Sequence, residues 1–182
     1  MNLTERTLEQ TYPYQGRILK VRVDRVELPN GMPAQREVIE HPGGVTVAAL
    51  TQQNELLFVR QFRYPYRKIL LELPAGKLDK GELDPLDAAK RELHEETGAV
   101  AENYISLGEF YPSAGFCNEV LYLYFCRVTR IGKPNPDQDE FLEPIAIPIE
   151  KAVRMALDNE IPDGKTQAAV LKTAMLLQQN KL

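Results

Sequence analysis

Three glutamates close together, Glu92, Glu95 and Glu96, are the residues of this chain that could most readily do chemistry as a group. In an α-helix, Glu92 and Glu96 would lie one above the other, and Glu95 would lie to one side of them. Like charges at this spacing repel each other and weaken the helix unless a cation sits on them. Oxygen ligands of this kind suit a hard divalent ion that keeps several waters, which indicates Mg²⁺ or Mn²⁺. The alternative is a solvated Glu-rich helix face, which is the commoner meaning of two adjacent glutamates.

The residues around these glutamates predict how they are positioned. Gly76 and Glu82 lie in a polar loop, and Asp84 follows with the side chain of a helix N-cap. Pro85 has the fixed φ that suits the first position of a helix. Gly98 can end the helix just after the last glutamate. A loop with these features makes the solvated face the weaker hypothesis.

The whole segment resembles the Nudix box, a strand–loop–helix signature written G-x5-E-x7-R-E-U-x-E-E-x-G-U, in which U is a bulky apolar residue. Its fixed positions are filled by Gly76, Glu82, Arg91, Glu92, Leu93, Glu95, Glu96 and Gly98. There are two departures: eight residues separate Glu82 from Arg91, and the last apolar position holds Ala99. We place the additional residue at Leu83, before the helix cap, which leaves the helical stripe of glutamates intact.

Composition and charge favour a small enzyme over a nucleic-acid-binding or membrane protein. The chain has 182 residues, of which 43% are hydrophobic, enough for one domain with an appendage. Its net charge of −4 does not suit a polyanionic partner such as nucleic acid or an anionic membrane. We find no apolar run of membrane-spanning length and no signal-peptide pattern at the amino end. The two cysteines, Cys117 and Cys126, are read as reduced thiols, which predicts a cytoplasmic protein.

The order of the predicted elements divides the chain in two. Residues 16–28 alternate between apolar and polar, and a Pro-Asn-Gly turn leads to a second strand over 34–40, which predicts a β-hairpin. The breaker sequence that begins at His41 places a boundary between a small β domain, 1–43, and a second domain, 44–182. That second domain is predicted to hold strands over 45–50, 55–62, 69–73, 104–111, 120–129 and 145–149, the box helix, and helices over 150–158 and 165–179 with Asp163 as cap of the last.

Outside the box, the chain resembles one branch of the Nudix superfamily, the ADP-ribose pyrophosphatases and related nucleoside-diphosphate-sugar hydrolases. Residues 59–76, 111–119 and 163–166 carry this likeness. It implies an α/β fold, namely an α/β/α sandwich with a mixed sheet, preceded by a small amino-terminal β domain. In this branch the β domain usually crosses onto a second subunit, so the resemblance also implies a homodimer. A two-stranded hairpin is too small to be stable alone, which agrees with a partner surface.

The resemblance also implies roles for the box residues. The metal ligands would be the Ala75 carbonyl, Glu92 and Glu96, with Glu95 as a shared ligand that also takes part in catalysis. Arg91 would pair with Glu95 or Glu82 and orient the catalytic groups. The general base would come from the loop before the last strand, where Glu140 is our candidate and Asp139 and Glu143 are the alternatives. A solvated acidic turn is the competing interpretation of that loop.

Substrate contacts are implied less directly. Arg36 and Arg63 correspond to positions where the branch uses arginine for phosphate or the terminal ribose, and a planar guanidinium suits both tasks. The alternative for both is an arginine at the surface of an edge strand. Phe116, Tyr12 or Tyr14 could stack on adenine. In the loop after 110, Gly115 would allow a close backbone approach to the sugar, and Glu119 would bind a ribose hydroxyl.

These observations leave three functional hypotheses. The first is metal-dependent hydrolysis of ADP-ribose to AMP and ribose 5-phosphate. The second is the same reaction on another nucleoside-diphosphate sugar such as GDP-mannose, because the box selects the pyrophosphate and not the base or the sugar. The third is a non-catalytic nucleotide-sensing module, which would be expected to lose box carboxylates that this chain keeps.

Overall fold

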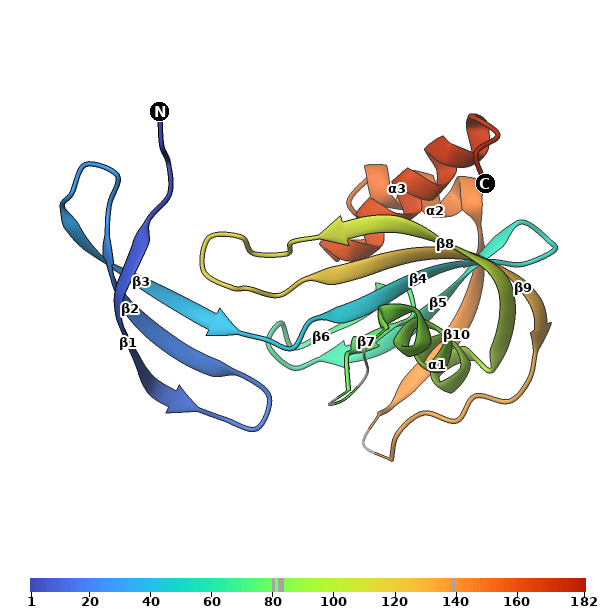
Figure 1. The fold of residues 1–182 in the computed structure, drawn as a ribbon. Coiled ribbons are helices and arrows are strands. Elements are labelled where there is room, and N and C mark those ends of the chain that lie inside the picture. Colours follow the sequence, from blue (N-terminus) through green and yellow to red (C-terminus); the bar gives the residue numbers. More distant parts are fainter. Residues whose placement is uncertain (80, 82–83, 139) are drawn as a thin grey trace. The chain divides into compact units, whose positions relative to one another are not determined.

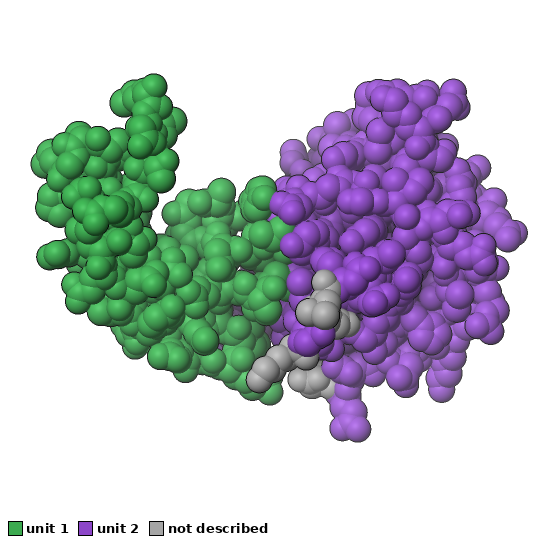
Figure 2. All heavy atoms as spheres, viewed as in Figure 1, with its two compact units in different colours: residues 1–43, 111–120 green, residues 44–110, 121–182 purple. Residues whose placement is uncertain are grey.

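The computed structural model describes residues 1–79, 81, 84–138 and 140–182 and divides them into two compact units (Figures 1 and 2). The first unit contains Met1–Gly43 together with Tyr111–Val120, and the second contains Gly44–Phe110 and Leu121–Leu182. The chain passes from one unit to the other between Gly43 and Gly44, where the breaker sequence lies. The segment 111–120 joins the amino-terminal unit, although it is far from it in sequence.

The amino-terminal unit contains a three-stranded antiparallel sheet in the order β1 (Arg6–Gln15), β2 (Lys20–Glu27) and β3 (Pro33–Glu40). The two later strands form the predicted hairpin. Gly31 has φ +82° in the turn between them and donates its N–H to the Leu28 carbonyl at 2.8 Å. This positive φ is a conformation that glycine adopts without strain.

Strand β1 shows that the prediction of only two strands in this unit was wrong. Every residue of β1 is exposed, so the strand has no alternation of apolar and polar residues from which it could be predicted. It also contains Pro13, which has no N–H for a ladder and lies where the register shifts between Thr11 and Tyr14. β1 is an edge strand, which is where a sheet tolerates proline.

The second unit is built on a seven-stranded mixed sheet. Its elements are β4 (Gly44–Leu50), β5 (Glu55–Arg63), β6 (Lys68–Glu72), β7 (Ala75–Lys77), α1 (Pro85–Thr97), β8 (Ala99–Phe110), β9 (Leu121–Ile131), β10 (Leu142–Pro148), α2 (Ile149–Leu157) and α3 (Gly164–Gln178). The main strand order is β10-β5-β4-β9-β8, while β6 pairs with β5 and β7 pairs with β4. β4 and β9 are parallel and the other pairs are antiparallel. β9 lies inside the sheet between β4 and β8, in agreement with the nearly all-apolar run 120–129 of the sequence.

Helices cover both faces of this sheet, so the predicted α/β/α sandwich is confirmed (Figure 1). Every residue of β4 is buried because its side chains alternate between two cores. Val45 and Val47 belong to the core that contains Leu93 of α1. Ala48 belongs to the opposite core, which contains Ala169 of α3. No helix in the described ranges is long and apolar enough to cross a membrane.

Helix α1 begins and ends as its sequence predicts. The Asp84 side chain accepts a hydrogen bond from the Leu86 N–H at 2.9 Å, and Pro85 occupies the first turn. Gly98 ends the helix with φ +70° and donates its N–H to the His94 carbonyl at 2.8 Å. A Cβ at Gly98 would overlap the Gly132 carbonyl, so both backbone conformation and space require glycine here. Glu82 and Leu83, where we placed the additional residue, lie outside the described residues.

Candidate active site

The candidate site lies where α1 packs on the short strand β7. Glu92 and Glu96 face the protein interior and are only 7% and 2% exposed. The Ala75 N–H donates to Glu96 Oε2 at 3.0 Å, which fixes the carboxylate beside the strand. A Cβ at Gly76 would overlap the Glu92 carboxyl group, so only glycine lets the strand pass this close. The first glycine of the box therefore makes room for its second glutamate.

The electrostatics of these two carboxylates are unusual for surface glutamates. Burial raises the pKa of Glu92 to about 7, and the nearby charges of Glu95 and Glu140 act in the same direction, against the opposing effect of Arg91. Burial raises the pKa of Glu96 to about 8, with Glu92 and Glu140 adding to the effect. The hydrogen bond from Ala75 and the charge of Arg63 oppose this rise without cancelling it. The site thus gathers negative charge that a bound cation would stabilise.

Arg91 forms hydrogen bonds with two glutamates that follow it on the same helix. Its Nη1 donates to Glu92 Oε1 at 2.8 Å and to Glu95 Oε2 at 3.0 Å, and its Nη2 donates to the Lys77 carbonyl at 3.3 Å. These contacts tie the helix to β7 and set the rotamer of Glu95. The Arg91–Glu95 pair expected from the sequence is present, whereas the alternative partner, Glu82, lies outside the described residues.

The carboxylates of the site are oxygen donors that could hold a divalent metal ion. Among the described residues, no group of three or more His, Cys, Asp or Glu side chains has the geometry of a metal site. Arg91 engages Glu92 and Glu95, which leaves Glu96 as the buried carboxylate without an ion pair in the described part of the chain. Two buried carboxylates next to the Ala75 backbone are nevertheless hard oxygen donors of the type that Mg²⁺ prefers. The donor atoms present therefore suit such an ion, although the side chains are not arranged as a complete coordination sphere.

The proposed base, Glu140, lies in the loop just before β10. It is exposed, and its N–H donates to the Asp137 carbonyl at 3.0 Å. Its charge raises the pKa of both Glu92 and Glu96, which places its carboxylate within electrostatic reach of the helix stripe. Of the alternatives, Glu143 forms an ion pair with Arg60 at 2.8 Å. Asp139 lies outside the described residues.

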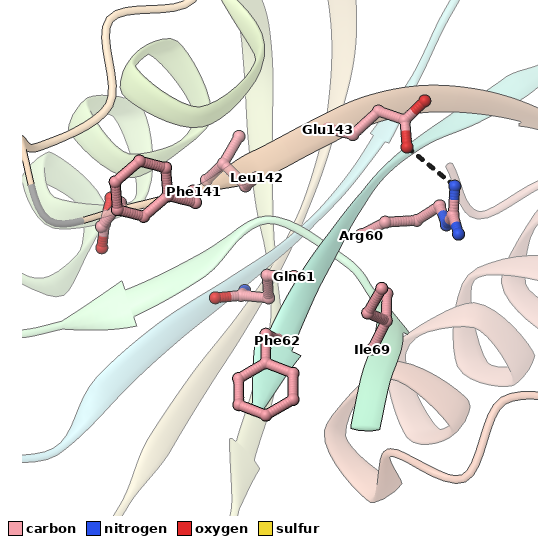
Figure 3. A pocket seen from close by; sticks show the side chains of 8 residues that line it. Arg60, Gln61, Phe62, Ile69, Phe141, Leu142 and Glu143 are labelled. Carbon is pink, nitrogen blue, oxygen red and sulfur yellow. Dashed lines mark hydrogen bonds and ion pairs between the residues drawn. The ribbon is translucent and has the colours of Figure 1, made fainter. Parts of the chain in front are cut away.

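Glu140 also lines a pocket of about 500 Å³ at the start of β10 (Figure 3). In Figure 3, the Gln61 side chain lies between those of Phe62 and Phe141, and the Arg60–Glu143 ion pair lies on another side. The full lining is Arg60, Gln61, Phe62, Ile69, Glu140, Phe141, Leu142 and Glu143. The volume falls in the range of small-molecule sites. The candidate base Glu140 is thus also part of the wall of this pocket.

Arg63 has a partner that the sequence analysis did not include. Its Nε and Nη2 donate to the two carboxylate oxygens of Glu72, each at 2.6 Å, and Lys165 forms a further ion pair with Glu72. The signal for this network was available, since Glu72 interrupts the apolar run 69–73 and a charge in a buried strand needs a partner. Sequence alone could not show that the partners would come from residues 63 and 165.

The other predicted substrate residues belong to the amino-terminal unit. Arg36 forms a two-pronged ion pair with Glu5, at 2.9 and 2.5 Å. Glu119 lies 3.2 Å from His41 Nδ1, and Phe116 is exposed. The backbone of Phe116 also accepts a hydrogen bond from the Ile39 N–H at 2.7 Å, so the 111–120 loop is fastened to the end of β3. Gly115, which also lies in this unit, has open space around its Cα and no positive φ.

The Glu72 network gives a prediction for stability at acid pH. Burial alone would raise the pKa of Glu72, but the hydrogen bonds and charges of Arg63 and Lys165 outweigh it and hold the pKa below its ordinary value. A carboxyl with a lowered folded-state pKa stabilises the fold above the unfolded-state pKa of about 4.3, and that contribution is lost as the pH falls. We expect the thermal midpoint to fall between about pH 5 and 3 more steeply in the wild type than in Glu72→Gln, as measured by circular dichroism. An equally steep fall of the thermal midpoint in both proteins would contradict this prediction.

Comparison with known proteins gives a consistent result. The NUDIX domain model matches residues 40–169, and a model for the nucleoside diphosphate sugar hydrolase N-terminal domain matches residues 5–39. The chain is 36% identical to an ADP-ribose pyrophosphatase of Bacillus subtilis, over 98% of this chain and 99% of that protein. It is 40% identical to a methanol dehydrogenase activator of Bacillus methanolicus, over 91% and 90% of the two chains. It is 32% identical to a GDP-mannose pyrophosphatase of Yersinia enterocolitica, over 75% and 77%. The chain therefore belongs to the Nudix hydrolase family and carries the amino-terminal domain of its nucleoside-diphosphate-sugar hydrolases.

Proposed function

We propose that this enzyme hydrolyses the pyrophosphate bond of ADP-ribose, releasing AMP and ribose 5-phosphate, with Mg²⁺ as its cofactor and Mn²⁺ as a possible substitute. The observation that carries the proposal is the pair of buried glutamates, Glu92 and Glu96, held against Gly76 and Ala75. Glu96 has no ion pair among the described residues, and a buried carboxylate without one is costly, so its presence here calls for a cation. Relatives with the name ADP-ribose pyrophosphatase support the choice of substrate.

The residues of the site have different proposed roles in the reaction. Glu92, Glu96 and the Ala75 carbonyl would hold the metal, which supplies charge neutralisation for the phosphate oxygens. Glu140 would accept a proton from the attacking water, so that oxygen bonds to phosphorus as the bridging P–O bond breaks. Arg91 would keep Glu92 and Glu95 in place through the hydrogen bonds described above. Arg63 would bind phosphate, and Arg36, Gly115, Phe116 and Glu119 would contact the base or the sugar.

The alternative is GDP-mannose or another nucleoside-diphosphate sugar, and relatives with the name GDP-mannose pyrophosphatase support it. The test is a panel of ADP-ribose, GDP-mannose, other nucleotide sugars and dinucleotides, each incubated with Mg²⁺ and with excess chelator, with products separated by chromatography. We expect AMP from ADP-ribose at the highest kcat/KM and no product in chelator. A higher kcat/KM for GDP-mannose than for ADP-ribose would make GDP-mannose the substrate, while the reaction would still be hydrolysis of a pyrophosphate bond. Saturable binding without hydrolysis would favour the sensing module.

Two further features stay predictions. The homodimer rests on the family resemblance alone, because the amino-terminal sheet has three strands and is not the two-stranded hairpin that would be too small to be stable by itself. The cytoplasmic location rests on the reduced state expected of the cysteines, both of which are free in the structure.

A further inference from the structure

Glu72 is a buried carboxylate that the proposed chemistry does not use. It is 1% exposed at the end of β6, next to the apolar residues Ile69, Leu70 and Leu71. A charge in such a place costs free energy unless it is both paired and hydrogen-bonded. The groups that pair with Glu72 must therefore offset that cost.

Two cations share this carboxylate. Arg63 binds both of its oxygens in a fork-like arrangement, at 2.6 Å each, which is the strongest geometry available to a guanidinium. Lys165, whose side chain is 11% exposed, donates its ammonium group to Glu72 Oε2 as well. Glu72 and Asp163 together balance the charges of Arg63 and Lys165.

The lysine is itself anchored at the start of α3. Its Nζ lies 2.9 Å from Asp163 Oδ2, and Asp163 is the N-cap that accepts the Thr166 N–H at 3.1 Å. The Thr166 hydroxyl accepts the Leu73 N–H at 3.0 Å and donates to Asp163 at 2.5 Å. The start of α3 is thereby fastened to the chain next to Glu72, and neither cation can reorient without breaking several hydrogen bonds.

The fork leaves one end of Arg63 available. Both donors to Glu72 come from one edge of the guanidinium, and Nη1 donates no hydrogen bond to any residue that the structure describes. The Arg63 side chain is 38% exposed, in contrast to its partner Glu72. Glu72, which holds Arg63, lies three residues before Ala75, whose N–H donates to Glu96 Oε2 at 3.0 Å, so the guanidinium is bound to the same chain segment as this candidate metal ligand.

We propose that Glu72 and Lys165 are positioning residues, which hold Arg63 so that its Nη1 binds a phosphate oxygen of the substrate beside Glu96. The proposal rests on the proposed pyrophosphate hydrolysis and extends it to residues that touch no substrate. A free arginine side chain must lose rotamer freedom when it binds, whereas one already held by a bidentate partner loses little. Because the network already forms when the protein folds, Arg63 loses little rotamer freedom on binding substrate, and the affinity is higher.

The test is steady-state kinetics with ADP-ribose at saturating Mg²⁺ on five proteins: the wild type, Arg63→Ala, Lys165→Met, Glu72→Gln and the double variant Arg63→Ala/Lys165→Met. We expect each single change to raise KM about tenfold or more while kcat falls by less than about threefold, because the lost interaction is one of ground-state binding. The double variant should have the KM of Arg63→Ala, since Lys165 acts only through the arginine. Lys90→Met is the matched control, because Lys90 forms an exposed pair with Asp87 on α1 and should leave KM unchanged.

Other outcomes would overturn the proposal. If Lys165→Met lowers the thermal midpoint but leaves KM unchanged, the network is only structural. If the KM effects of Arg63→Ala and Lys165→Met multiply in the double variant, the lysine does not act through the arginine. If Glu72→Gln does not fold, the KM values of Arg63→Ala, Lys165→Met and the double variant are sufficient for the test. If the wild type hydrolyses no nucleoside-diphosphate sugar, the proposed function fails separately. Calorimetric titration with inorganic pyrophosphate and Mg²⁺ would then decide, since affinity equal in the wild type and Lys165→Met rejects the positioning role.

Discussion

Replacing Glu96 by glutamine is expected to lower kcat by about 100-fold or more while the protein stays folded. Glu96 is buried against Ala75, and burial together with the nearby charges of Glu92 and Glu140 raises its pKa to about 8, so its ionised form is unfavourable without a cation. Glutamine keeps the size of the side chain but cannot supply a charged oxygen to a metal ion. Because the substitution removes repulsion between like charges, the metal-free variant should unfold at a temperature no lower than that of the wild type.

Two measurements separate the metal hypothesis from a simple loss of structure. Mg²⁺ should raise the thermal midpoint of the wild type, because an ion that binds only the folded state stabilises it, and should leave Glu96→Gln almost unchanged. Glu102→Gln is a suitable control, since Glu102 is an exposed glutamate on β8. Full activity of Glu96→Gln, or of the wild type in excess chelator, would rule out the assignment of this stripe.

The order of the elements in the second unit could be predicted from sequence because local signals agreed with the fold. The apolar run in β9 indicated an interior strand, and Asp84 and Asp163 were identified as helix caps from side-chain type and position. Strand β1 was missed for the opposite reason. Its residues are all exposed and include a proline, so no apolar face marks the strand, although its threonines and tyrosines are types that favour strands. The partners that make it a strand lie on β2.

The same contrast holds for the candidate site. The box glutamates were found because their spacing on one helix is a local property, and the structure turns Glu92 and Glu96 inward together. Arg63 was assigned to the substrate by resemblance, but its bidentate bond to Glu72 and the contribution of Lys165 depend on the pairing of distant segments. Likewise, no local pattern predicts that residues 111–120 join the amino-terminal unit. Contacts between segments far apart in sequence were what local patterns could not supply.

Replacing Glu140 by glutamine is expected to lower kcat by about 100-fold or more with little change in KM. A general base contributes in the transition state, when it takes a proton from the attacking water, and contributes little to substrate binding. The exposed position of Glu140 in the loop before β10 gives it access to solvent and substrate. Its charge contributes to the raised pKa of Glu92 and Glu96, which supports a position near these two carboxyls.

The neighbouring carboxylates supply the controls for this experiment. Asp137→Asn removes a charge from the same loop but keeps the backbone carbonyl that accepts the Glu140 N–H, so it should leave kcat almost unchanged. Glu143→Gln would break the ion pair with Arg60, and a large loss of kcat there, with Glu140→Gln fully active, would move the base to Glu143. If both glutamines leave kcat unchanged, neither Glu140 nor Glu143 is the base, and the proton acceptor must be sought among the box glutamates that Arg91 holds in place.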